Sequence, residues 1–160
     1  RHINMMNDAN NLYQKTNSEK TTFKIENSSK SWDIEKAKGL INEYRKKNNL
    51  PTLRLNTQLT EAATVHSRDL SKWDRISHFG SDGSNPLDRV KRTGYNPKFA
   101  AESIGTGQNN FQDVLDSWIR NPGDKRNLLS ADVKDIGLAV VQDPKTEFKS
   151  FWVSVLAAHD

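Results

Sequence analysis

The sequence predicts one α+β domain in which a small central sheet is covered by helices on both faces. Three segments carry apolar residues at helical spacing, and a fourth has the start and stop signals of a short helix. Three short apolar stretches rich in branched and aromatic residues lie mainly in the second half of the chain. Helices therefore outnumber strands and precede most of them, an order that favours helical layers packed on a sheet. The 160 residues suffice for one core of ordinary size and are too few for two comfortable domains.

Residues 1–30 differ in composition from the rest of the chain. They are rich in Asn, Ser, Thr and Lys and poor in aliphatic residues, so they offer little apolar surface to offset the entropy of ordering. We predict a polar N-terminal tail or linker over 1–30 and a folded domain over 31–160.

Two helices are expected before the middle of the chain. The first begins after Ser31 and ends at 48–51, where Asn-Asn-Leu-Pro stops it. The second follows Asn56 or Thr57 as its N-cap. Its apolar stripe consists of Leu59, Ala62, Ala63, His66, Leu70 and Trp73.

Two further helices follow. Ser84 or Asn85 caps a short third helix, which begins on Pro86 and ends before Gly94. A fourth helix ends at the Asn-Pro-Gly sequence of 121–123. Its apolar positions follow an i, i+3, i+4, i+7, i+8 spacing: Phe111, Val114, Leu115, Trp118 and Ile119.

Three stretches are predicted as strands. They cover 100–105, 136–141 and 148–156, and the last two are joined across a turn at Asp143-Pro144. They supply the central sheet.

Composition and motifs exclude several classes of protein. The net charge of +4 comes from 24 basic and 20 acidic residues spread along the chain, so we expect no nucleic-acid partner. No apolar run is long enough to cross a membrane, and the absence of cysteine excludes disulfides and thiolate metal sites. The chain opens without an apolar signal core, and we expect a secretion signal to have been removed. Nucleophile-elbow, Walker, HExxH and dinucleotide motifs are absent.

Three residues are candidates for a functional site. His78 lies between the second helix and a Gly-Ser-Asp-Gly turn, and it either faces a site or bonds to its own loop. Glu102 lies within a predicted strand, where a carboxylate needs His78 or a cation as partner unless it faces solvent. His66 is either a hydrogen-bonded core histidine or part of a cavity wall.

Acidic and basic residues near the third helix are assigned structural roles. Asp82 belongs to the turn, and Asp88 favours the start of the helix through its dipole. Arg89 is placed with them.

A series of short motifs resembles the bacterial CAP domain, also called the SCP-like domain, of the cysteine-rich secretory and pathogenesis-related protein superfamily. The resemblance covers about residues 34–157. In chain order the motifs are His66-Ser67-x-Asp69, Ser77-His78, Asp88-Arg89, Gly94-Tyr95, Ala101-Glu102-Ser103-Ile104, Trp118, Asn121-Pro122-Gly123, Asn127-Leu128-Leu129 and Ile136-Gly137.

The resemblance implies a three-layer α-β-α sandwich with a mostly antiparallel sheet, a secreted or periplasmic location, and a cleft where two His and two Glu bind a divalent metal. His78 and Glu102 match one His and one Glu of that set. Asn121 and Asp124 stand where the second Glu and second His would be. With one imidazole, the set lacks the second nitrogen donor that the family's zinc site uses. His78, Glu102 and Asp124 could hold a harder cation weakly, or form a polar cluster with His66.

These features together predict a binding module. We expect Glu102 to fix the tautomer and orientation of His78, and we expect a cleft that recognises an extracellular ligand: a lipid, a cell-envelope component or a protein. One alternative is a hydrolase in which His78 and Glu102 are catalytic, with or without a metal. The other is a structural domain with a vestigial cleft.

Overall fold

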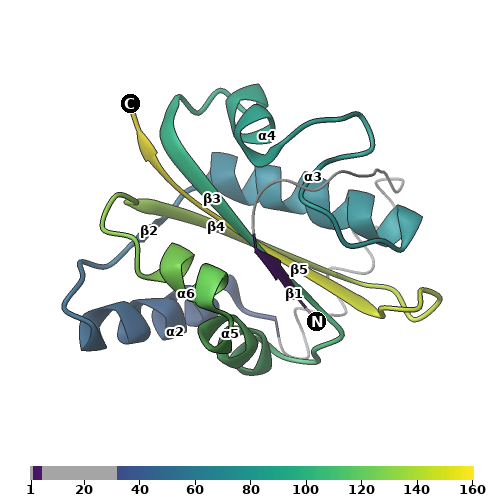
Figure 1. The fold of residues 1–160 in the computed structure, drawn as a ribbon, viewed down its shortest axis with the longest axis horizontal. Coiled ribbons are helices and arrows are strands. Elements are labelled where there is room, and N and C mark those ends of the chain that lie inside the picture. Colours follow the sequence, from purple (N-terminus) through teal and green to yellow (C-terminus); the bar gives the residue numbers. More distant parts are fainter. Residues whose placement is uncertain (1, 5–31) are drawn as a thin grey trace.

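The structure, a computed structural model, describes residues 2–4 and 32–160 and confirms the predicted α+β sandwich (Figure 1). Helices α3 and α4 lie on one side of the sheet and α2, α5 and α6 on the other. The elements are β1 (His2–Asn4), α2 (Ile34–Lys47), β2 (Arg54–Leu55), α3 (Thr57–Trp73), α4 (Pro86–Arg92), β3 (Pro97–Thr106), α5 (Phe111–Arg120), α6 (Pro122–Leu128), β4 (Asp135–Gln142) and β5 (Ser150–His159).

The sheet has five strands in the order β1-β3-β5-β4-β2. All neighbours are antiparallel except β2 and β4, which pair in parallel. Strand β5, which comes last in the sequence, therefore lies at the centre, with β3 along one side and β4 along the other. Glu102 of β3 and Gly137 of β4 both pair with Val155 of β5.

Polar side chains cap the helices where the sequence predicts starts. Asn56 accepts a hydrogen bond from the Leu59 amide at the start of α3. Asn85 and Asp88 form a reciprocal capping box around the first turn of α4. Gly94 follows the end of α4 with φ 94°, a left-handed conformation that glycine adopts without a steric penalty.

Each face of the sheet has its own apolar core. The α2, α5 and α6 side includes Ile41, Phe111, Trp118, Leu128 and Trp152. The α3 and α4 side includes Leu59, Leu70, Val90, Tyr95 and Phe151. Strand residues therefore alternate between two buried faces, as expected of a central sheet covered on both sides.

The backbones of α3 and β4 approach each other very closely. A Cβ atom on Gly137 would overlap the backbone of Leu59 and Thr60. The first turn of the helix therefore lies directly on the strand, and only glycine leaves room for it.

Two elements differ from the sequence prediction. Helix α6 is absent from the prediction: the Asn-Pro-Gly sequence stops the fourth helix as expected, and it also starts α6, because Asn121 is both the C-cap of α5 and the N-cap of α6. The two-residue strand β2 is absent from the prediction, since its register depends on β4, some eighty residues later in the chain. The three predicted strands are present as β3, β4 and β5 with slightly different ends.

The predicted tail falls largely outside the described residues. Within it, residues 2–4 form the edge strand β1 beside β3. Among the helices that the structure describes, none has the length and apolar character needed to cross a membrane.

Candidate functional site

His78 and Glu102 are in contact, as the sequence predicts. The Nδ1 atom of His78 lies 2.7 Å from Oε1 of Glu102, and both side chains are fully buried. A carboxylate only accepts hydrogen bonds, so the proton of this contact belongs to Nδ1. Glu102 therefore fixes the tautomer of His78 and the orientation of its ring.

Arg89, to which the sequence assigns a structural role, also contacts this pair, a contact that the sequence analysis does not predict. Its Nη2 atom donates to Oε2 of Glu102 at 2.9 Å and to the carbonyl of His78 at 2.8 Å. Its Nη1 atom donates to the carbonyl of Ser84 at 2.9 Å. One buried guanidinium thus holds the carboxylate and both ends of the loop at 78–84.

Glu102 remains ionised in this setting. Burial on its own would raise the pKa of the carboxyl group, but the neighbouring His66, Arg89 and His78 lower it to about 2. Arg89 is the neighbour that carries a permanent charge, so we assign most of the effect to it. We call His78, Glu102 and Arg89 the buried triad.

His66 is a core histidine behind the triad. Its Nε2 atom lies 2.6 Å from the carbonyl of Ser77 and 3.7 Å from Oε1 of Glu102. Burial lowers the pKa of His66 to about 3, so the ring is neutral and its Nε2 carries the proton donated to Ser77. His66 thereby ties α3 to the residue that precedes His78.

The two positions that depart from the family pattern occupy the start of α6. Asn121 uses its side-chain oxygen to cap the helix, accepting from the amides of Gly123 and Asp124 at 3.1 Å each. Asp124 is fully buried, and burial raises its pKa to about 7 against the lowering effects of Ser103 and His78. Asn127 joins α6 to β3 by donating to the Glu102 carbonyl at 3.2 Å.

The residues present do not fit the divalent metal that the family resemblance implies. The two oxygens of Glu102 are engaged by His78 and Arg89, and a bound cation would lie against a guanidinium. Within residues 2–4 and 32–160, no three His, Asp or Glu side chains are grouped so that they could hold a metal ion.

Asp69 of α3 supports the loop that carries His78. Its Oδ2 atom accepts a hydrogen bond from the Ser81 amide at 2.9 Å, and the side chain is buried. Its Oδ1 atom has no hydrogen-bond partner among the described residues. Burial raises the pKa of Asp69 to about 8, so the folded protein keeps this carboxyl group protonated at neutral pH.

We expect the free energy of unfolding of Asp69→Asn, taken relative to that of wild type, to be higher at about pH 8 than at about pH 5. Between these values the unfolded carboxyl group has lost its proton while the folded one retains it, so wild-type stability falls as the pH rises. The asparagine side chain does not ionise, and the difference should amount to about 1–3 kcal/mol. Urea unfolding at the two pH values measures it. The exposed Glu43→Gln variant is the control and should follow wild type; a pH-independent effect of Asp69→Asn would contradict the assignment.

Comparison with known proteins decides the family. Residues 38–156 match the model of the cysteine-rich secretory protein family, CAP, which covers most of the domain described above. The chain belongs to the CAP family. The buried triad and its neighbours thus lie in a CAP domain without a single cysteine.

Three bacterial proteins illustrate what the chain is similar to. An uncharacterized protein YkwD of Bacillus subtilis (strain 168) is 28% identical over 103 residues, which are 64% of this chain and 40% of that protein. An extracellular protein containing an SCP domain from Bacillus anthracis str. Ames has a TM-score of 0.68 at 23% identity, over 77% of this chain and 39% of that one. The chain thus spans about two fifths of the length of these two proteins.

A third relative is similar over nearly its whole length. An outer surface protein from Borrelia burgdorferi has a TM-score of 0.67 at 21% identity, over 79% of this chain and 92% of that one. At this identity the likeness of the two solved structures establishes the fold of the CAP domain, and its function has to be argued from its own residues.

Proposed function

We propose that this CAP domain is an extracellular binding domain whose buried triad holds the fold together and performs no hydrolysis. One observation carries the proposal: both oxygens of Glu102 are engaged inside the protein, by His78 and Arg89, and neither Glu102 nor His78 reaches the surface. The triad is therefore a neutralised internal network rather than an open reactive site.

A hydrolase needs a different arrangement. A general base must lie within hydrogen-bond reach of the proton that it abstracts from water or from a nucleophile. His78 is fully buried, and Glu102 is paired with a guanidinium that stabilises its charged form. These features favour structural stability over proton transfer to a substrate.

The extracellular location is supported by the relatives. The Bacillus anthracis protein is described as extracellular and the Borrelia burgdorferi protein as an outer surface protein. The absence of cysteine agrees with a bacterial exterior, where small domains need no disulfides if their core is large enough. A lipid, a cell-envelope component or another protein is the expected ligand class.

Activity assays test the absence of catalysis. We expect the intact protein to hydrolyse casein and simple esters at the background rate, and Glu102→Gln and His78→Gln to give the same background. Circular dichroism must show that each variant is folded under the assay conditions. Hydrolysis by the wild type that both folded variants lose would overturn the proposal.

Binding assays test the proposal that the domain binds an extracellular ligand. The probes are zinc, calcium and magnesium by calorimetry, and purified bacterial peptidoglycan and phosphatidylglycerol vesicles by cosedimentation. We expect no saturable heat for the metals and retention on one of the two envelope preparations. Retention on neither would favour the structural domain with a vestigial cleft.

A further inference from the structure

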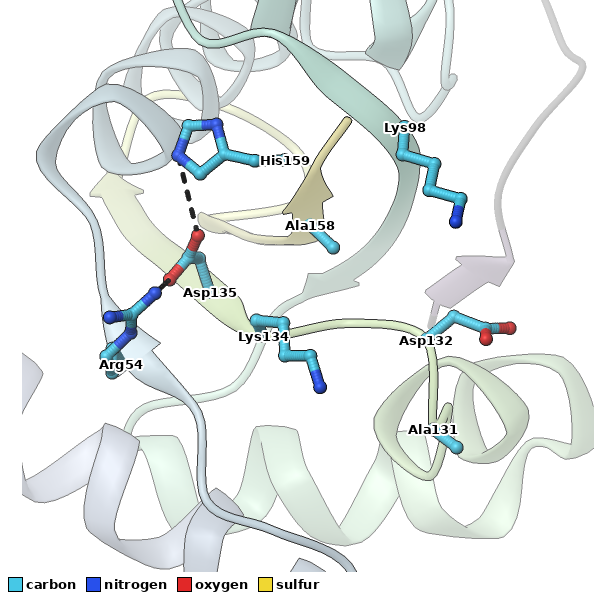
Figure 2. Close-up of a pocket in the computed structure, with 8 residues that line it drawn as sticks. All are labelled: Arg54, Lys98, Ala131, Asp132, Lys134, Asp135, Ala158 and His159. Carbon is cyan, nitrogen blue, oxygen red and sulfur yellow. Dashed lines mark ion pairs between the residues drawn. The ribbon is translucent and has the colours of Figure 1, made fainter.

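We propose that the CAP domain binds a phosphate group in a cationic pocket at one end of the sheet (Figure 2). The pocket has a volume of about 330 Å³, and its polar lining is Arg54, Lys98, Asp132, Lys134, Asp135 and His159. This proposal does not depend on the buried triad: Lys98 precedes Glu102 by four residues on β3, about 13 Å along the strand.

The pocket is built on the ends of four adjacent strands. Arg54 begins β2 and pairs with Asp135 at the start of β4, next to Lys134. At the same end of the sheet, Pro97 at the start of β3 pairs with His159 at the end of β5. Side chains from separate parts of the sequence are thus brought together on a rigid scaffold, which lowers the entropic cost of binding.

Asp135 anchors one wall. Its side chain is buried and accepts a hydrogen bond of 2.7 Å from the Tyr95 hydroxyl group. It forms an ion pair of 3.3 Å with Nη2 of Arg54, and Nε2 of His159 lies 4.0 Å away (Figure 2). His159 is also stacked on Tyr95, with 3.9 Å between ring centroids. Asp135 therefore orients Arg54 and His159, and its own charge is already compensated.

The lining has an excess of positive charge. Three cations, Arg54, Lys98 and Lys134, face two carboxylates, Asp132 and Asp135. Arg54 keeps 78% of its side chain exposed despite its ion pair. Both lysines are exposed, and neither forms an ion pair with any residue in 2–4 or 32–160. The pocket thus presents two ammonium groups that have no counter-ion within the described part of the chain.

The arrangement suits a phosphate better than a carboxylate. Arg54, Lys98 and Lys134 extend from three different places around the pocket (Figure 2). A tetrahedral phosphate offers oxygens in several directions, so one group can accept charge-assisted hydrogen bonds from all three, whereas the two oxygens of a carboxylate lie in one plane. Asp132 opposes binding and limits the affinity.

The test is a titration of the ¹⁵N-labelled protein followed by NMR, with ionic strength kept constant by sodium chloride. The probes are inorganic phosphate and glycerol 1-phosphate. We expect saturable shifts at the amides of Arg54, Lys134 and Asp135. Tighter binding of glycerol 1-phosphate would assign the site to a phosphate ester, and tighter binding of inorganic phosphate would assign it to the free ion; both support the proposal.

Matched variants distinguish phosphate binding in this pocket from nonspecific electrostatic attraction to the protein. The double variant Lys98→Ala/Lys134→Ala should weaken binding by roughly tenfold. Lys36→Ala/Lys46→Ala removes the same charge from exposed positions of α2 and should leave affinity within about twofold. Asp132→Asn should tighten binding, a gain that a damaged fold does not produce. Shifts that fail to saturate, equal losses in the two double variants, or unchanged affinity in Asp132→Asn would overturn the proposal.

Discussion

Replacing Gly137 with alanine is expected to abolish the fold. The added methyl group would overlap the backbone of Leu59 and Thr60 at the start of α3, and backbone atoms held by a helix and a sheet cannot move aside as a flexible side chain can. The loss should exceed about 4 kcal/mol, a large share of the stability of a domain of this size. Thermal unfolding followed by circular dichroism measures it.

Gly39 provides the matched control. It lies within α2, and apart from its chain neighbours and the backbone of its own helix, no atom of the described residues lies within 4 Å of the position that a Cβ would take. Gly39→Ala should therefore raise the stability by about 0.5–1 kcal/mol through helix propensity. A cooperative Gly137→Ala variant that melts within a few degrees of wild type would show that α3 does not rest on β4 as described.

Breaking the ion pair between Glu102 and Arg89 from either side is expected to have the second largest effect. Glu102→Gln leaves a buried guanidinium without its counter-charge, and Arg89→Met leaves a buried carboxylate without one. Each should cost about 3–5 kcal/mol. The double variant should cost clearly less than the sum of the two, because no unpaired charge remains. Urea unfolding of the four proteins gives this coupling energy.

The exposed ion pair between Arg92 and Asp82 is the control for that cycle. Both of its side chains are more than half exposed, so Arg92→Met should cost less than about 1 kcal/mol. Additive effects of Glu102→Gln and Arg89→Met would contradict the buried triad.

The pH dependence of stability is an independent test of the ion pair between Glu102 and Arg89. The pKa of Glu102 is lowered by folding, so its contribution is present above the unfolded pKa and disappears as the pH falls toward about 2. Buried His66 acts in the same direction, because the unfolded chain takes up its proton at a higher pH than the folded one. Wild type should lose stability in acid, and Glu102→Gln should lose less.

Local chemistry explains which parts of the fold the sequence predicts. Asn56, Asn85 and Pro86 act within one helical turn of their own positions, and they mark the helix starts correctly. Strand β2 has only two residues, and nothing near them indicates that β4 will pair with them. Asn121 stops α5 as predicted, but the sequence analysis misses α6, because one residue can end a helix and begin the next.

In the candidate site, too, the sequence predicts what nearby residues determine and misses what depends on distant ones. Glu102 in a strand indicates that a partner exists, and the position of His78 at the edge of a turn marks it as a candidate. The sequence assigns Arg89 to helix chemistry because its neighbours Asp88 and Pro86 explain the helix start without it. Its pairing with Glu102, thirteen residues away, depends on how α4 packs on β3.

The central place of β5 sets the order in which the domain can be made. Both long neighbours, β3 and β4, pair with this strand, so neither is fully bonded until residue 159 has left the ribosome. Until then α3 lacks the part of its packing surface that β5 supplies. The sheet, and with it both apolar cores, can therefore be completed only after the whole domain has been synthesised.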